Sequence, residues 1–194
     1  MTEDDLEDRF LELAFANKNN RAILERLLDL GAPDAWLVAG CLYQSVWNAH
    51  DGRPPEVDIK DYDIFYYDAS DLSYEAEDEV IKRGDALFAD LGVEVEVRNQ
   101  ARVPLWFEQH FGAPYPPISG SAEGIERFVV ECTCLGIRPD GKGGHAVEAP
   151  YGFQDMFDGI LRYNAKSPTP HHFESKAGSY KARWPWLTIV PMAG

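Results

Sequence analysis

The sequence predicts a single α/β (α+β) domain, and three observations support this prediction. Short apolar runs of strand length alternate along the chain with longer segments of helical periodicity, which is the pattern of a sheet flanked by helices. The 194 residues are 45% hydrophobic and 12% aromatic, which is enough apolar material for one domain with its own core. No internal repeat is present in the sequence, so a repeat architecture is not expected.

The first two helices are expected near the N-terminus. Thr2 followed by Asp5 resembles a capping arrangement for a helix over residues 3–16. Asn20 is suited to cap a second helix over residues 21–30, because its side chain can accept a hydrogen bond from a free N–H group of the first turn. Each helix therefore has its own start signal in the sequence.

The same kinds of pattern predict the rest of the fold. Apolar runs and strict alternation favour strands, and glycine or proline marks the ends of elements. After Gly31, which ends the second helix, the expected elements are a strand at 35–39, a helix at 41–50, a loop at 51–55, a strand at 59–67, a helix at 73–91, a strand at 93–97, a helix at 104–111, a hairpin that pairs 128–137 with 145–149, and a helix at 151–163.

We place the domain at residues 1–166 and a basic, aromatic C-terminal tail at residues 167–194, packed on or near the domain. Two roles are open for the tail. Lys176, Lys181 and Arg183 could fold over the phosphates of a nucleotide. A flexible tail that pairs with the acidic body of the protein is the preferred interpretation.

The charge of the chain argues against a long nucleic-acid partner. The net charge is −15, from 33 acidic and 18 basic residues, and no Lys/Arg cluster is longer than a dipeptide. Surfaces that bind nucleic acid normally carry a basic patch or stripe. A small, metal-chelated phosphate ligand remains compatible with this charge, because the metal supplies positive charge locally.

The sequence predicts a reduced, cytoplasmic protein with no membrane partner. No apolar run approaches the roughly 18 residues that a membrane-spanning helix needs, and the acidic start MTEDD is unlike a signal peptide. Cys41, Cys132 and Cys134 lack the CxxC spacing typical of zinc sites. Buried, reduced thiols explain them better, with Cys132 and Cys134 on one face of a strand.

The most informative segment is residues 60–67, KDYDIFYY, an aromatic strand with two carboxylates. Side chains two positions apart in a strand point to the same face, so Asp61 and Asp63 are expected side by side. Two like charges in this position are unfavourable unless a cation lies between them. Because Mg²⁺ favours one or two carboxylates together with substrate phosphates, the pair predicts half of a metal site for phosphate chemistry.

Two further features lie on either side of this pair in the sequence. Gly40 stands between a predicted strand and a predicted helix, where the free N–H groups of the helix start suit a phosphate. The next strand carries Glu94 and Glu96, either of which can supply a third carboxylate on the same sheet face. The other glutamate must then lie on a solvated face.

The order of these elements resembles that of the polymerase-β-like nucleotidyltransferase superfamily. Its pattern is a small-residue turn after the first strand, an Asp-x-Asp pair on the second and a third acid on a later strand. The resemblance covers about residues 20–163 and is carried by WLVAG at 36–40 leading to Trp47-Asn48, DYDIFYYD at 61–68 and EVRNQARV at 96–103. Together these segments look like one bacterial branch of the superfamily, and the third favours Glu96 over Glu94.

The resemblance implies a nucleotidyltransferase-type mixed sheet and metal-dependent transfer of a nucleoside monophosphate from a nucleoside triphosphate to a hydroxyl of a small molecule or a protein. It implies Asp61, Asp63 and Glu96 as the catalytic and metal-binding residues, with Mg²⁺ (or Mn²⁺) as the cofactor. The nucleotide-binding residues that it implies are Gly40, Cys41, Gln44 and Arg98.

Two departures from the family pattern keep a second interpretation open. Gly40-Cys41 stands where the superfamily has Gly-Gly or Gly-Ser, and the interval from Gly40 to Asp61 is longer than is typical. The alternative is a catalytically weak relative that binds a nucleotide or a protein partner as a regulatory module. Three retained acids favour the enzyme, since a binding module has no need to hold three like charges together. Arg98 fits either a phosphate contact or an ion pair with a nearby glutamate.

Overall fold

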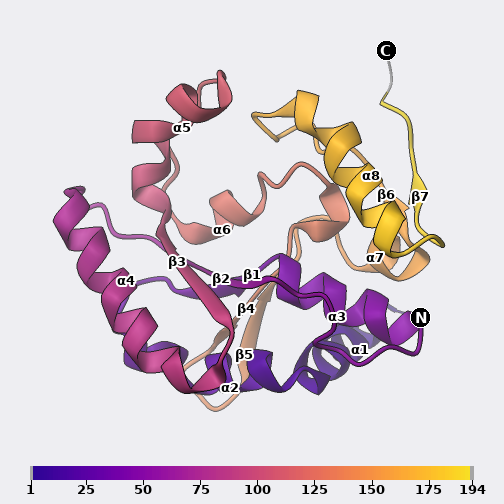
Figure 1. The fold of residues 1–194 in the computed structure, drawn as a ribbon, viewed down its shortest axis with the longest axis horizontal. Coiled ribbons are helices and arrows are strands. Elements are labelled where there is room, and N and C mark those ends of the chain that lie inside the picture. The colour runs from indigo at the N-terminus through magenta and orange to yellow at the C-terminus, as the bar shows by residue number, and fades with distance from the viewer. Residues whose placement is uncertain (1, 193–194) are drawn as a thin grey trace.

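A mixed five-stranded sheet forms the centre of the protein in the computed structural model, which describes residues 2–192 (Figure 1). Its strands lie in the order β3-β2-β1-β4-β5. Their bounds are β1 Trp36–Val38, β2 Asp61–Tyr66, β3 Glu94–Asn99, β4 Gly136–Pro139 and β5 His145–Glu148. Only β2 and β3 pair in parallel, and the other neighbours in the sheet are antiparallel. The predicted mixed sheet flanked by helices is therefore confirmed.

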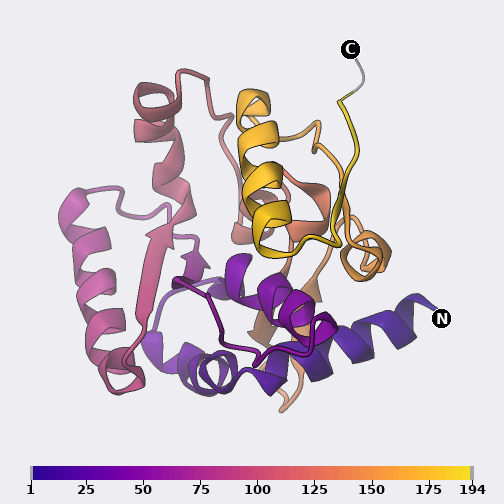
Figure 2. The same ribbon diagram turned by 45° about the vertical axis from the view of Figure 1, so that its right-hand side comes forward.

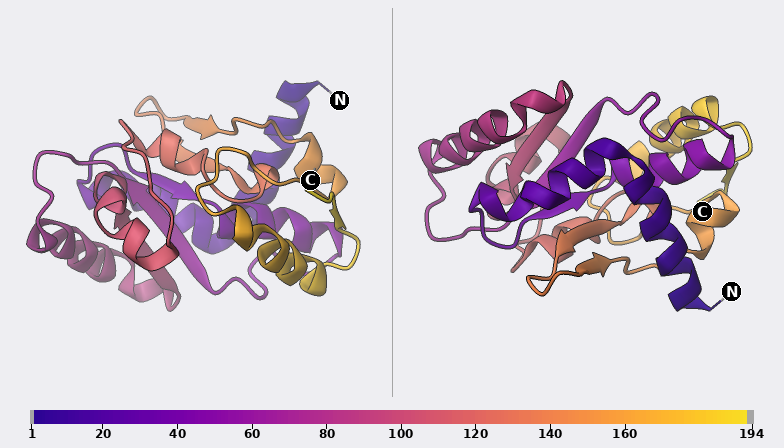
Figure 3. Two further views of the ribbon diagram at one scale, coloured as in Figure 1. Left: turned by 90° about the horizontal axis from the view of Figure 1, so that it is seen from above. Right: turned by 90° about the horizontal axis from the view of Figure 1, so that it is seen from below.

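The helices lie on both sides of the sheet. Their bounds are α1 Glu3–Ala16, α2 Lys18–Arg26, α3 Gly40–His50, α4 Tyr74–Phe88, α5 Val103–Phe111, α6 Ser121–Ile125, α7 Gln154–Asp158 and α8 Phe173–Arg183. Figure 2 shows α5 and α8 rising on the same side of the sheet, whereas α1 and α2 cross the other side, as seen from below in Figure 3. No helix in residues 2–192 has the length and apolar character needed to cross a bilayer.

The start of the second helix was predicted at the wrong asparagine. Asn17 caps α2, and its side chain accepts hydrogen bonds from the N–H groups of Asn19 and Asn20. Asn20 instead lies fully buried inside the first turn, where its amide donates to the carbonyl oxygens of Ala14 and Cys41. The first helix, α1, is confirmed together with its capping box of Thr2 and Asp5.

The predicted hairpin is shorter than expected at its first strand. The ladder begins at Gly136, and a 3₁₀ turn at Glu131–Thr133 replaces the expected strand. Cys132 and Cys134 therefore do not share a strand face, although both are buried and free, as is Cys41.

The C-terminal third also differs from the prediction. Only α7 is helical within the segment predicted at 151–163, and β6 (Ile160–Leu161) follows it. Residues 173–183, which were assigned to the basic, aromatic tail without a predicted helix, form α8, and β7 (Thr188–Ile189) then pairs in parallel with β6.

Helix α8 packs on α3 through an aromatic contact with two buried hydrogen bonds. The Tyr43 hydroxyl donates to the Tyr180 hydroxyl over 2.7 Å. The rings of Trp47 and Trp184 meet edge to face with their centroids 5.2 Å apart. The Trp184 indole N–H donates to Asn48 Oδ1 over 3.1 Å. Because all of these side chains are buried, α8 belongs to the core.

Replacing Trp184 by Phe should lower the free energy of unfolding by about 2–4 kcal/mol, because Asn48 Oδ1 loses its partner and part of the ring volume becomes a cavity. Trp106→Phe is the matched control, since this side chain is only partly buried, and its cost should stay below about 1 kcal/mol. Urea-induced unfolding measures both values. Equal losses in the two variants would contradict the role given to the Trp184 hydrogen bond.

Candidate functional site

The Asp-x-Asp pair lies on β2 as the alternation predicts. Tyr62 and Ile64 point into the core, while Asp61 and Asp63 are partly exposed on the other face. The parallel register places Asp63 opposite Glu96 on β3. Two neighbouring strands therefore present the three acids named by the sequence.

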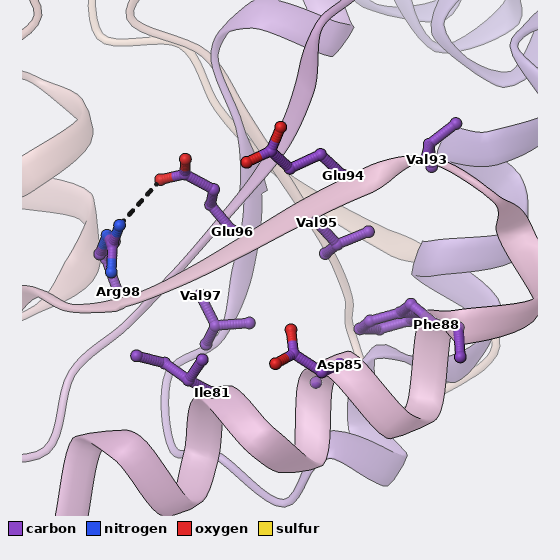
Figure 4. A pocket seen from close by; sticks show the side chains of 11 residues that line it. Ile81, Asp85, Phe88, Val93, Glu94, Val95, Glu96, Val97 and Arg98 are labelled. Carbon is purple, nitrogen blue, oxygen red and sulfur yellow. Dashed lines mark hydrogen bonds and ion pairs between the residues drawn. The ribbon is translucent and has the colours of Figure 1, made fainter.

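Strand β3 divides its side chains cleanly between its two faces (Figure 4). Val95 and Val97 point towards α4, where they line a hollow of about 310 Å³. Glu94, Glu96 and Arg98 lie on the opposite face, and Arg98 donates to Glu96 Oε2 over 3.1 Å. Of the two interpretations of Arg98, the ion pair is therefore present in this structure.

The Asp63 carboxyl group lies in an unfavourable electrostatic environment. Burial, followed by the negative charges of Asp61 and Glu96, raises its pKa from 3.8 to about 7. The positive charges of Lys176 and Arg98 act in the opposite direction, but their effect is smaller. Glu94 is exposed and is not among these influences. The geometry thus groups Glu96, and not Glu94, with Asp63.

The turn before α3 brings backbone close to Asp61. Ala39 has a positive φ of 54° and starts the helix without a side-chain cap. A Cβ atom on Gly40 would lie 3.0 Å from Gln44 Nε2 and 3.9 Å from Asp61 Oδ1. This glycine therefore keeps space open beside the carboxylate, at a helix end whose first N–H groups suit an anion.

Cys41 contributes to this turn only through its backbone. Its side chain is fully buried and its thiol lies 3.6 Å from the carbonyl oxygen of Val38. Burial, with a smaller contribution from the charge of Asp63, raises the pKa of the thiol well above its usual range. The Cys41 thiol therefore stays protonated, and Cys41 is not among the residues that line the cavity between α5 and α8.

Helix α8 brings two cations to the site that the sequence analysis had assigned by preference to a flexible tail. Arg183 donates to Gln44 Oε1 over 3.0 Å, and Lys176 is close enough to Asp63 to lower its pKa. Lys181 is directed elsewhere and binds the carbonyl oxygens of Pro185 and Leu187. The i, i+7 spacing of Lys176 and Arg183 could have indicated one helix face, had the helix been recognised.

One cavity of about 920 Å³ lies between α5 and α8, and its lining includes Gln44 and Arg98 but neither Glu96 nor Cys41. Its floor includes Asp61, Asp63 and Gly40, and one wall includes Lys176 and Arg183. The volume lies in the upper part of the range of small-molecule sites, on the order of 300–1,000 Å³.

The donor set fits a divalent metal that shares its coordination with a substrate. Within residues 2–192, no three His, Cys, Asp or Glu side chains converge into a metal-binding group. Asp61 and Asp63 nevertheless face a cavity as adjacent carboxylates, with burial and like charge opposing ionisation of Asp63. Mg²⁺ characteristically binds one or two carboxylates and completes its shell with phosphate oxygens and water.

A family model and a solved structure bear on the family and on the fold. A family model described as Nucleotidyltransferase matches residues 25–189. A solved structure, whose title reads "The NMR structure of the protein reveals a CCA-adding enzyme head domain", has a TM-score of 0.71 at 24% identity over 95% of this chain and 96% of its own. A structure named "tRNA-processing enzyme (apo form 2)" has a TM-score of 0.46 at 14% identity over 87% of this chain, which spans 44% of it. No curated protein matches the chain.

The pKa of Asp63 predicts how stability depends on pH. Its folded-state value, about 7, lies above its ordinary 3.8, so the folded protein binds more protons than the unfolded chain between these values. The stability of the metal-free protein should therefore fall as the pH rises through this window and level off above it.

Asp63→Asn should remove this loss, and its gain in unfolding free energy should grow from near zero at about pH 4 to a few kcal/mol at about pH 8. Unfolding in the presence of EDTA measures the gain. Asp85→Asn, an exposed aspartate on α4, is the control. A gain that is the same at both pH values would show that the charge of Asp63 is not the cause.

Proposed function

Because the chain belongs to the nucleotidyltransferase family, we propose that it transfers a nucleoside monophosphate from a nucleoside triphosphate to a hydroxyl group of a small molecule or a protein, with Mg²⁺ or Mn²⁺ as the cofactor. The observation that carries the proposal is the position of Asp63. It lies in a cavity beside Asp61 and opposite Glu96, and its burial, followed by the negative charges of these two acids, raises its pKa. A divalent cation would relieve this repulsion and could complete its coordination shell with phosphate oxygens of a substrate.

In this proposal Asp61 and Asp63 hold the metal, and Glu96 completes the site. The bound metal would neutralise the charge that develops on the phosphates and on the departing pyrophosphate. All three acids are the same residues that the Asp-x-Asp spacing and the EVRNQARV segment had singled out.

In the proposed complex, the phosphates of the nucleoside triphosphate lie at the start of α3. The N–H groups of Gly40 and Cys41 would donate to them, and Gln44 lies one turn further along the helix. Lys176 and Arg183 add positive charge from α8, on the same side of the cavity as Gln44. Cys41 replaces a residue that could contact phosphate through its side chain, so the backbone and the cations carry this contact.

Glu96 acts on the acceptor. Its carboxylate takes the proton of the acceptor hydroxyl, whose oxygen forms a bond to the α-phosphorus while the bond to pyrophosphate breaks. Arg98 holds Glu96 over 3.1 Å and, because it also lines the cavity, it can exchange this partner for a phosphate oxygen.

The alternative, a nucleotide- or partner-binding regulatory module, is favoured by two observations. Glu96, the third acid, is paired with Arg98. Among the described residues, no three acidic side chains are assembled into a metal-binding group. Metal-dependent turnover, as opposed to metal-dependent binding, separates the two functions.

Nucleotide binding should raise the melting temperature only when Mg²⁺ is present. A nucleoside triphosphate at about 100 times its Kd should add about 2.7 kcal/mol, which is several degrees for a domain of this size. Thermal shifts with each of the four ribonucleoside triphosphates, with and without Mg²⁺, test this in wild type and Asp63→Asn. A shift that survives in the variant, or that ignores Mg²⁺, would count against the proposed metal site.

Lys176→Ala should raise the Kd for the bound triphosphate about tenfold, because it removes one charge-assisted phosphate contact of roughly 1.5 kcal/mol. The matched control is Lys82→Ala, an exposed lysine on α4 that pairs with Asp78. Isothermal titration with the triphosphate that gives the thermal shift measures both affinities. Equal affinities in the two variants would contradict the proposed contact between α8 and the phosphates.

A further inference from the structure

The cavity has two chemically different walls. On the side of α3 and α8 its lining contains the polar and cationic side chains of Gln44, Lys176 and Arg183, beside the buried residues Tyr43 and Tyr180. On the side of α5 its lining is aromatic, and the contributing side chains are Trp106, Phe107, Phe111 and Tyr115. Figures 1 and 2 show α5 and α8 standing apart on the same side of the sheet.

The aromatic wall is already assembled. The Phe107 ring lies 4.6 Å from that of Phe111 and 4.7 Å from that of Tyr115, measured between centroids. The Arg127 guanidinium lies over Tyr115 at 4.6 Å and donates to the carbonyl oxygen of Pro116 over 2.6 Å. These side chains form an apolar surface of mutually tilted rings, and the nearby cation is already bound to backbone.

The direction of the reaction assigns the aromatic wall to the acceptor. In-line transfer places the incoming hydroxyl on the side of the α-phosphorus opposite the leaving pyrophosphate. The phosphates lie towards α3 and α8, so the hydroxyl must arrive from the side of β3 and α5. Glu96 lies on β3, and the chain continues from β3 through a 3₁₀ turn at Gln100–Arg102 directly into α5.

We propose, on the basis of the proposed function, that the α5 wall binds the body of the acceptor and that the acceptor is a small alcohol with an aromatic or flat apolar group. Its oxygen loses a proton to Glu96 and forms the new bond to the α-phosphorus. The P–O bond between the α- and β-phosphates breaks, and pyrophosphate leaves with the electron pair.

The charge and the roof of the cavity argue against the 3′ end of an RNA at this place. Arg98 and Arg127 are single cations on the acceptor side, paired with Glu96 and with a backbone carbonyl oxygen, and they do not form the basic stripe that follows a polynucleotide backbone. Phe111 on α5 meets His172, just before α8, edge to face at 5.7 Å between centroids. This contact bridges the two walls above the site and favours a compact acceptor.

The test uses three acceptor probes, 2-phenylethanol, glycerol and an RNA octanucleotide, with the triphosphate that gives the Mg²⁺-dependent thermal shift. Binding is followed by the NMR signal of the Trp106 indole N–H, assigned with Trp106→Phe and titrated with 2-phenylethanol without nucleotide. Transfer is followed by pyrophosphate release and by the mass of the nucleotidylated product.

We expect 2-phenylethanol to shift the Trp106 signal and to be the preferred acceptor. Phe107→Leu should raise the KM for this alcohol about tenfold and leave the KM for the triphosphate unchanged within about twofold. Leu105→Ala is the matched control on the same helix, because Leu105 is 61% exposed and does not line the cavity. Its kinetic constants should equal those of wild type.

Three results would overturn the acceptor site. In the first, 2-phenylethanol at its solubility limit leaves the Trp106 signal unmoved. In the second, the nucleotide alone shifts this signal as strongly as 2-phenylethanol does. In the third, the RNA or glycerol is nucleotidylated in preference to the aromatic alcohol. A failure of the proposed function is distinguishable, because no nucleotide would then give a thermal shift while 2-phenylethanol would still move the Trp106 signal. That combination would support the binding site and overturn the transfer reaction alone.

Discussion

The position of the site depends on one buried helix. Residues 40–48 of α3 are all buried, so this helix is held on every side and its amino end has little freedom to move. Asn20 and Ser45 both donate to the carbonyl oxygen of Cys41, and Trp184 donates to Asn48 at the other end. A phosphate site built from backbone N–H groups needs this rigidity, because those groups bind only as well as they are positioned.

The charge distribution is the second constraint. The chain carries a net charge of −15, and burial, followed by the negative charges of Asp61 and Glu96, raises the pKa of Asp63 to about 7. The cations that act against this repulsion, Lys176 and Arg98, come from α8 and from β3. Negative charge is thus concentrated at the floor and positive charge on the walls. This arrangement suits a metal-chelated phosphate, in which both signs of charge find partners within one ligand.

Local sequence patterns predicted the parts of this site that lie within a single strand or a single turn. The two-residue period of a strand is enough to place Asp61 beside Asp63, and Gly40 marks the turn before α3. The missed parts depend on contacts between distant residues. Three asparagines lie at the start of α2, and Asn20 is drawn inside the first turn by its hydrogen bonds to the carbonyl oxygens of Ala14 and Cys41.

The same reason explains the errors in the C-terminal third. The Asn164 amide donates to the carbonyl oxygens of Glu126 and Phe128 over 2.7 Å, and these bonds hold the chain in turns where an apolar run had suggested a strand. The apolar positions of α8, Phe173, Ala177 and Tyr180, have helical spacing. Prolines just before the helix obscured this pattern in the sequence.

Helix α8 connects stability to the proposed chemistry. Tyr180 on α8 and Trp184 directly after it pack against α3. Lys176 and Arg183 of the same helix line the cavity. A change that loosens this packing therefore alters the position of the cations as well as that of the phosphate-binding turn, since both are carried by the same contact. The aromatic wall on α5 shares no such contact with α3. The two sides of the cavity can consequently differ in rigidity, with the phosphate side fixed by the core and the acceptor side held by the packing of its own rings.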